Sequence, residues 1–154
     1  MTIRNPHRIS LAALAIGGLL LISASAQQPP ATNVIRVEIS GFQSDKGQVI
    51  CSLLSSASGF PSKSEQAIGH AKPAIANRSA VCEFAGVQPG RNAISVVHDE
   101  NSNGKMDTNF VGRPKEGMGA SNDAKGHMGP PKFDAAAFQF AGGRLNLKIN
   151  LFYL

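Results

Sequence analysis

The ten residues from His98 to Asp107 carry the clearest chemical pattern in this chain. Oxygen-bearing side chains recur there at alternate positions, a glycine follows, and a further carboxylate closes the pattern: Asp99, Asn101, Asn103, Gly104 and Asp107. Short loops that wrap Ca²⁺ order their ligands in this way, because a hard cation prefers carboxylate and carbonyl oxygens. The spacing therefore predicts a loop that can bind calcium.

Counting from Asp99 assigns a ligand to each odd position of the loop. We expect side-chain oxygens from Asp99, Asn101 and Asn103, the backbone carbonyl of Lys105, and the carboxylate of Asp107, directly or through water. Position twelve is Phe110 instead of the bidentate glutamate of a complete EF-hand, so we expect a weak affinity, around 10⁻⁴–10⁻³ M. A further carboxylate could fold back from Glu116, Asp123 or Asp134.

The same residue types also form turns that need no metal. Asn and Asp side chains accept hydrogen bonds from nearby backbone amides, and Asn103-Gly104 is a strong turn signal. A metal-free, hydrogen-bonded turn is therefore the alternative to the calcium loop, and the sequence leaves both open.

A catalytic role would need a different set of residues. The candidates for a metal-dependent hydrolase are His98, Asp99, Glu116 and His127. Such an enzyme needs a cation with an open coordination position and a cleft that excludes water, and no local spacing rule supports this set. His98 alternates with Ile94 and Val96, as a histidine on the core side of a strand would. Ser121-Asn122-Asp123 lacks the sequence context of a serine nucleophile, so we interpret it as a turn.

The first 26 residues have the features of a secretory signal peptide. Arg4 and Arg8 precede an apolar run at 9–22, and Ala24-Ser25-Ala26 fits a cleavage site. We expect a short leader at 27–33, one domain at 34–154, and no membrane span after cleavage. An uncleaved anchor is the alternative. The protein should be exported, to the periplasm or the medium.

Charge and cysteine content narrow the function further. Loss of the two arginines lowers the net charge of +5 by two, and the remaining charges are scattered. We therefore expect no nucleic-acid binding. Cys51 and Cys82 both fall on the apolar face of a predicted strand, and an exported protein meets oxidising conditions. A disulfide between them is our prediction, with two buried free thiols as the alternative.

Alternation of apolar and polar residues predicts six or seven strands and no long helix. The expected strands are 34–40, 48–54, 80–84, 92–98, 136–141 and 144–153, and the first two should form a hairpin. Ser62 and Glu65 resemble a capping box at the start of a short helix. Residues 99–134 form a long, glycine-rich loop before the last two strands. We predict an antiparallel β-sandwich, immunoglobulin-like or transthyretin-like.

The segment from Phe84 to Phe133 also resembles a known family. It contains the block HDEN-S-NG-K-M-D, then GRPKEGMGASN, then GPPKF, in that order. These blocks resemble the family called domain of unknown function 2141, found mostly in exported bacterial proteins. The resemblance implies a β-sandwich and export, and it implies no reaction.

These observations together predict an exported, non-catalytic β-sandwich that serves as a binding or structural module, with an acidic loop that Ca²⁺ can stabilise. Its partner would be an envelope protein or a surface component. The metal-dependent hydrolase is the alternative. A small-molecule carrier ranks last, because the chain has only eight Phe, one Tyr and no Trp.

Overall fold

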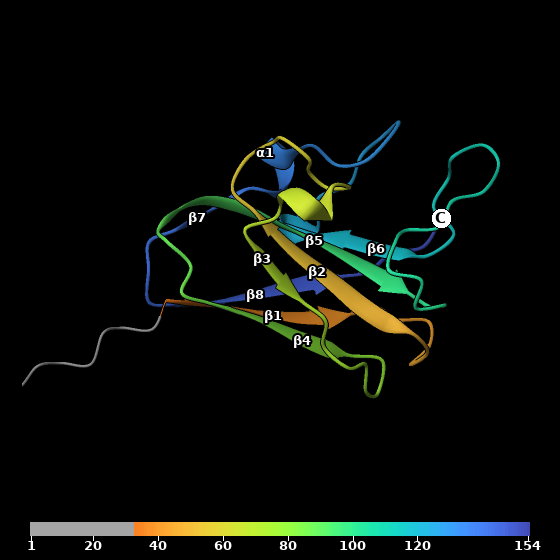
Figure 1. Ribbon diagram of the computed structural model, residues 1–154, viewed down its shortest axis with the longest axis horizontal. Coiled ribbons are helices and arrows are strands. Elements are labelled where there is room, and N and C mark those ends of the chain that lie inside the picture. The colour runs from red at the N-terminus through yellow and green to blue at the C-terminus, as the bar shows by residue number, and fades with distance from the viewer. Residues whose placement is uncertain (1–32) are drawn as a thin grey trace, which may run out of the picture.

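The computed structural model describes residues 33–154, and it is a sandwich of two β-sheets (Figure 1). Strands make up 43% of the described residues and helices 8%, which confirms the predicted all-β sandwich. The predicted signal peptide at 1–26 and the leader up to residue 32 lie outside the described residues.

The smaller sheet has three strands in the order β4 (Ala80–Ala85), β1 (Val34–Ser40) and β8 (Arg144–Asn150). β1 pairs antiparallel with β4 and parallel with β8. The alternation read from the sequence holds in β1, where Ile35, Val37 and Ile39 are fully buried. This face of the sheet forms one wall of the core.

The larger sheet runs β3 (Gly69–Ala71), β2 (Gln48–Leu54), β5 (Gly90–Asp99) and β6 (Gly117–Ala120). β7 (Phe138–Phe140) pairs with the first residues of β5, whereas β6 pairs with its last residues. Three short helical turns connect the strands: η1 (Ser64–Gln66), η2 (Ser121–Asp123) and α1 (Phe133–Ala136). No helix among the described residues is long and apolar enough to cross a membrane.

The core lies between the two sheets, and a disulfide crosses it. Cys51 in β2 is bonded to Cys82 in β4, which confirms the predicted pairing. Both cysteines are buried among the inward side chains of the strands. The bond therefore joins the two sheets covalently within the packed interior.

The predicted hairpin between the first two strands is wrong. β1 already has β4 on one side and β8 on the other, so neither of its edges is free for β2. Residues 41–47 instead carry the chain from the smaller sheet to the larger one. Gly47 ends this crossing with φ +75°, and a Cβ there would lie 2.1 Å from the Asp99 carbonyl oxygen, so only glycine fits.

The predicted long loop contains a strand that its sequence conceals. β6 is Gly-Met-Gly-Ala, too short and too poor in branched side chains for a strand signal. A Cβ on Gly119 would lie 2.7 Å from the Ile149 side chain, so the glycine permits close packing on β8. The strand expected at 136–141 is shorter, at Phe138–Phe140, with α1 before it. The expected capping box is absent, because η1 begins after Lys63 without a side-chain cap.

Hydrogen bonds of η2 and β6 connect the larger sheet to β8 and the residues after it. Ser121 Oγ donates to the Ala136 carbonyl at 2.6 Å and accepts the Ile94 amide at 2.9 Å. Asp123 accepts the Asn150 amide at 2.9 Å, and Met118 exchanges two backbone hydrogen bonds with Phe152. Ser121-Asn122-Asp123 is thus a structural turn, and it joins β6 to β8.

Replacement of both cysteines by alanine should lower the free energy of unfolding by about 3–4 kcal/mol, because the bond closes a long loop in the unfolded chain. Urea unfolding of the oxidised protein and of the Cys51→Ala, Cys82→Ala variant measures the difference. Reduction of the native protein should give a similar loss. Equal stability of the variant and the oxidised protein would contradict a structural role for the bond.

Candidate functional site

The acidic loop follows the end of β5, at the end of the sandwich where the chain's C-terminus also lies (Figure 1). Asp99 is the last residue of β5, and it sits opposite Gln48 in the register of β2 and β5. The loop then leads into a hairpin at 107–115, which projects from the sheets. The segment returns to the body at Glu116, just before β6.

Asp99 is fully buried and holds the turn that follows it. Its Oδ1 accepts the Asn103 amide at 3.0 Å, and its Oδ2 accepts the Gly104 amide at 2.7 Å. The Gln48 side-chain amide donates to the same Oδ2 at 2.6 Å. A buried carboxylate requires such donors, because an unpaired charge in the interior is costly. Asp99 therefore fixes the loop to β2 as well as to its own strand.

Glu116 closes the other side of the loop. Its two carboxylate oxygens accept the Glu100 amide at 3.1 Å and the Asp107 amide at 2.9 Å. The side chain is nearly buried, and the Lys115 amide adds a bond to the Asp107 carbonyl. Of the three carboxylates considered for this loop, Glu116 is the one that folds back to it. Asp123 binds the Asn150 amide, and Asp134 pairs with Arg91.

Three polar side chains converge on the solvent side of the loop. The side-chain amides of Asn101 and Asn103 donate to the two oxygens of Asp107 at 2.6 and 3.0 Å. Their own oxygens accept the backbone amides of Asn103 and Lys105. The hydrogen-bonded turn that the sequence left open is thus formed, and it gathers the third, fifth and ninth loop positions at one place.

Both aspartates are held in the ionised form. Burial alone would raise the pKa of Asp99, but the donors Gln48, Gly104 and Asn103 outweigh it and lower the pKa. Hydrogen bonds from Asn103 and Asn101 lower the pKa of Asp107, and Lys105 and Lys115 lower it further. At neutral pH the loop therefore presents a carboxylate to solvent with a second one beneath it.

His98 has no ring nitrogen free for chemistry. Its Nε2 lies 2.8 Å from the Lys46 carbonyl, which can only accept, so this nitrogen carries the proton. Its Nδ1 lies 2.7 Å from the Tyr153 hydroxyl and accepts from it, and that hydroxyl oxygen accepts the Gln43 amide at 3.1 Å. The imidazole is fully buried and pins the C-terminal segment to the crossing at 41–47.

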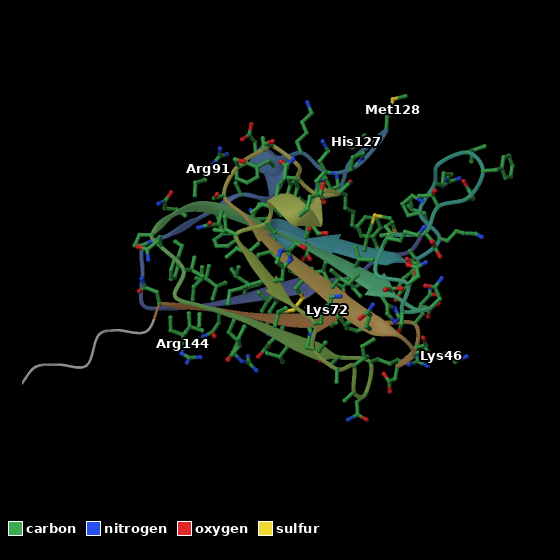
Figure 2. All side chains as sticks on the ribbon, in the orientation of Figure 1. Lys46, Lys72, Arg91, His127, Met128 and Arg144 are labelled. Atoms are coloured by element: carbon green, nitrogen blue, oxygen red, sulfur yellow. A yellow bond between two sulfur atoms is a disulfide. The ribbon has the colours of Figure 1, made fainter. Side chains whose placement is uncertain are left out.

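The four residues of the hydrolase alternative are not brought together as a metal site. Within residues 33–154, no group of three or more His, Cys, Asp or Glu side chains is placed to hold an ion. His98, Asp99 and Glu116 each bind protein groups. His127 lies on an exposed loop whose tip is Met128 (Figure 2). Nothing in this geometry favours hydrolysis.

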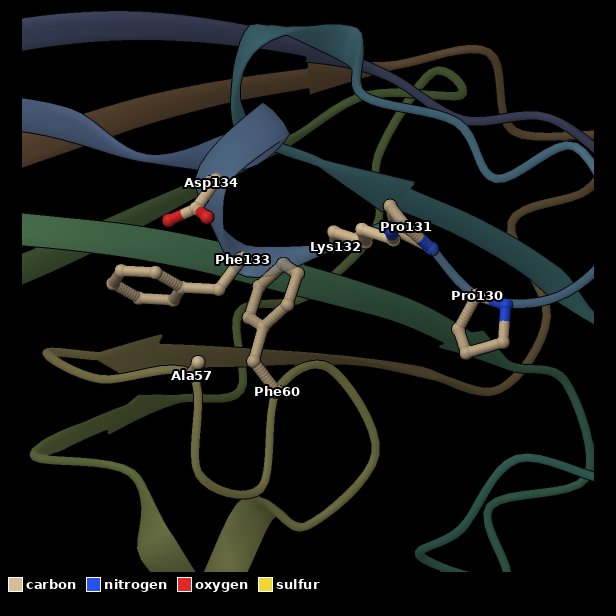
Figure 3. Close-up of a pocket in the computed structure, with 7 residues that line it drawn as sticks. All are labelled: Ala57, Phe60, Pro130, Pro131, Lys132, Phe133 and Asp134. Atoms are coloured by element: carbon tan, nitrogen blue, oxygen red, sulfur yellow. The ribbon is translucent and has the colours of Figure 1, made fainter.

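A shallow pocket of about 370 Å³ opens elsewhere on the surface (Figure 3). The rings of Phe60 and Phe133 meet edge to face across it, 5.8 Å apart. Arg91 lies 5.3 Å from the Phe133 ring and pairs with Asp134 at 2.8 Å, so its charge is already balanced. The pocket lies at the surface, outside the core between the sheets where a carrier would enclose its ligand.

Two contributors to this site were missed by sequence reasoning. Gln48 lies in β2 and Tyr153 lies three residues after β8, both far from the loop in sequence, and both were assigned only a place in an alternating pattern. Gln48 is a polar residue opposite Asp99 at the end of β5. Its position indicates a contact with the loop only once the register of β2 and β5 is known.

Comparison with known protein families identifies the family of this chain. Residues 37–148 match the family described as uncharacterized protein conserved in bacteria, DUF2141. The match covers well over half of the chain, so the chain belongs to this family, which confirms the resemblance seen in its sequence. Neither the curated proteins nor the solved structures contain a significant match.

Stability should fall on acidification, and Asp99 should account for much of the fall. A carboxyl with a lowered pKa stabilises the fold above its ordinary value of 3.8, and that contribution is lost as the pH drops through the folded-state pKa. Asp99→Asn should cost about 2–3 kcal/mol at neutral pH, because one of the two acceptor oxygens becomes an NH₂ group that cannot accept from the donors around it, and should flatten the acid limb. Urea unfolding from pH 7 to pH 2 measures both. Asp134→Asn, an exposed carboxylate, is the control, and an unchanged acid limb in Asp99→Asn would contradict the assignment.

Tyr153→Phe should destabilise the fold by about 1–3 kcal/mol, because the buried His98 Nδ1 loses its donor. A double-mutant cycle with His98→Leu isolates the pair, since the single losses should sum to more than the double loss. Additive effects in thermal or urea unfolding would show that the two side chains act independently.

Proposed function

We propose that this member of the DUF2141 family is an exported, non-catalytic β-sandwich that serves as a binding or structural module, and that its acidic loop takes Ca²⁺ to become more rigid. The observation that carries the proposal is the convergence of Asn101, Asn103 and Asp107 at one exposed place on a loop framed by two buried carboxylates. The module role is supported by Asp99 and Glu116, whose carboxylates accept hydrogen bonds from backbone amides and so hold the loop in shape.

A cation would enter on the solvent side of Asp107. The side-chain amides of Asn101 and Asn103 would rotate to present oxygen instead of nitrogen. This gives up their two hydrogen bonds to Asp107 and the two that their oxygens accept from backbone, in exchange for two Ca²⁺ ligands. The Lys105 carbonyl and a carboxylate oxygen of Asp99, the predicted first ligand, would complete the set. Competition with bonds that already exist supports weak binding, around 10⁻⁴–10⁻³ M.

Export is supported by two independent features. The sequence begins with a predicted signal peptide, and the Cys51–Cys82 disulfide suits an oxidising compartment. Free Ca²⁺ outside the cytoplasm commonly reaches the range in which weak modules bind it. The proposed partner is an envelope protein or a surface component, which the projecting loops would meet.

Ca²⁺ should raise the thermal midpoint of the oxidised chain 27–154 above its value in EDTA. A site that binds only the folded state stabilises it by RT ln(1 + [L]/Kd), which is about 1.4 kcal/mol at a tenfold excess over Kd. A millimolar Ca²⁺ series, with Mg²⁺ for comparison, measures the rise by calorimetry.

Asp107→Asn should abolish the rise, because it removes the charged ligand on the solvent side. Asp134→Asn removes the same charge from an exposed side chain away from the loop and should leave the rise intact. A flat response of the native protein, or an equal response of both variants, would sink the calcium proposal and leave the loop as a hydrogen-bonded turn.

A further inference from the structure

The hairpin that follows the acidic loop holds two apolar side chains out in solvent. Phe110 is 100% exposed and Val111 is 62% exposed, although most large apolar residues of this chain lie in the core. The hairpin is closed at its neck by the bridge between Thr108 and Pro114. We define these residues, Thr108–Lys115, as the tip hairpin.

The exposure of Phe110 belongs to a well-built turn. Asn109 Oδ1 accepts the amides of Val111 at 3.0 Å and Arg113 at 2.9 Å, and its carbonyl accepts the Gly112 amide at 2.9 Å. The Asn109 amide in turn donates to the Arg113 carbonyl at 2.8 Å. Three successive amides at the tip are therefore satisfied without water, which lowers the cost of bringing this backbone to the edge of an apolar phase.

Positive charge stands directly behind the apolar tip. Arg113 and Lys115 are exposed within the hairpin, Lys105 is exposed at its base, and the segment 108–115 has no Asp or Glu. The nearby carboxylates of Asp99 and Glu116 are buried and directed at backbone amides. The tip hairpin itself is thus apolar at its point and cationic behind it, and the solvent-facing carboxylates of Asp107 and Glu100 lie at its base.

We propose that the tip hairpin docks on an anionic phospholipid bilayer, with Phe110 and Val111 among the acyl chains and Arg113 and Lys115 at the lipid phosphates. A projecting tip of two apolar side chains is too small for a stable protein interface, which buries about 800 Å² on each partner. A bilayer needs only such a tip, with cations to add attraction to its negative surface. The proposal rests on the module role above but needs no Ca²⁺.

A second loop presents the same combination. Met128 is fully exposed at the end of the loop between η2 and α1, with His127 beside it (Figure 2). Lys125 and Lys132 flank this loop, and Gly126 and Gly129 bracket its end. Both loops project beyond the sheets in the view of Figure 1. Met128 offers the bilayer a further apolar contact, and the test below rests on the tip hairpin alone.

The absence of tryptophan from the chain provides a direct probe. Phe110→Trp, made in the chain 27–154, places the single indole at the tip; this chain keeps every described strand and lacks the apolar run at 9–22, which would itself bind lipid. Vesicles of phosphatidylcholine and phosphatidylglycerol in equal parts, in EDTA and low salt, should shift its emission to the blue, and brominated acyl chains should quench it. Ile68→Trp, at an exposed apolar residue before β3, should respond to neither.

Sedimentation with the same vesicles tests the two parts of the tip. Phe110→Ser should weaken binding roughly tenfold, since it removes the larger of the two apolar side chains that would enter the bilayer. Arg113→Gln with Lys115→Gln should weaken it on the order of tenfold, whereas Arg144→Gln with Lys148→Gln, an equal loss of charge on the outer face of the smaller sheet, should have little effect.

Several outcomes would overturn the proposal. They are no binding of the native chain to anionic vesicles, equal losses in the two charge variants, or an unchanged affinity of Phe110→Ser. A blue shift that depends on protein concentration without lipid would instead identify a second copy of the chain as the occupant. Because all measurements are made in EDTA, failure here leaves the calcium melt as a separate test of the proposed function.

Discussion

The pairing of β1 with both β4 and β8 is the constraint on which the rest of this structure depends. Because both edges of β1 are taken, the chain must leave the smaller sheet after Ser40 and cross to the larger one. The crossing ends at Gly47 against the Asp99 backbone, and it places Gln48 within reach of the Asp99 carboxylate. The parallel β8 then delivers Tyr153 to His98 at the same end of the sandwich.

That end of the molecule is organised by buried polar side chains. Asp99, Glu116 and His98 are all removed from solvent, and each binds backbone from a segment other than its own strand or turn. A polar group in the interior must be paired, so these side chains select one loop conformation over the many available to a glycine-rich segment. Order in the loop thus comes from carboxylates directed inward, with no need for a hydrophobic core of its own.

The inward direction of these carboxylates also determines the electrostatics of the exterior. With Asp99 and Glu116 engaged by amides, the charges of the tip hairpin are cationic, from Arg113 and Lys115, while the Asp107 carboxylate and the Lys105 ammonium lie at its base. The same hydrogen bonds hold the hairpin away from the sheets, so its apolar tip has no surface of its own chain to cover it. The proposed ion site and the proposed membrane contact are therefore two faces of one loop, one at its neck and one at its point.

The sequence by itself determined the all-β class, most of the strands and the inward faces of β1 and β2. Those features follow from a period of two residues and from the chemistry of turns, which are local properties. The sequence predicted the disulfide between Cys51 and Cys82 with two free thiols as the alternative, and the structure decided for the bond. Only the tertiary structure decided which strands pair, because alternation shows which face of a strand is buried but not which strand lies next to it. The expected hairpin of β1 and β2 was wrong for this reason. Strand β6 depends on its pairing with β5 and on the close packing of Gly119 against β8, and neither can be read from its four residues. The spacing identified the loop residues but not their roles. The contact with Gln48 buries Asp99 as a support of the loop, whereas Asp107 is held by the loop's own side-chain amides and faces solvent.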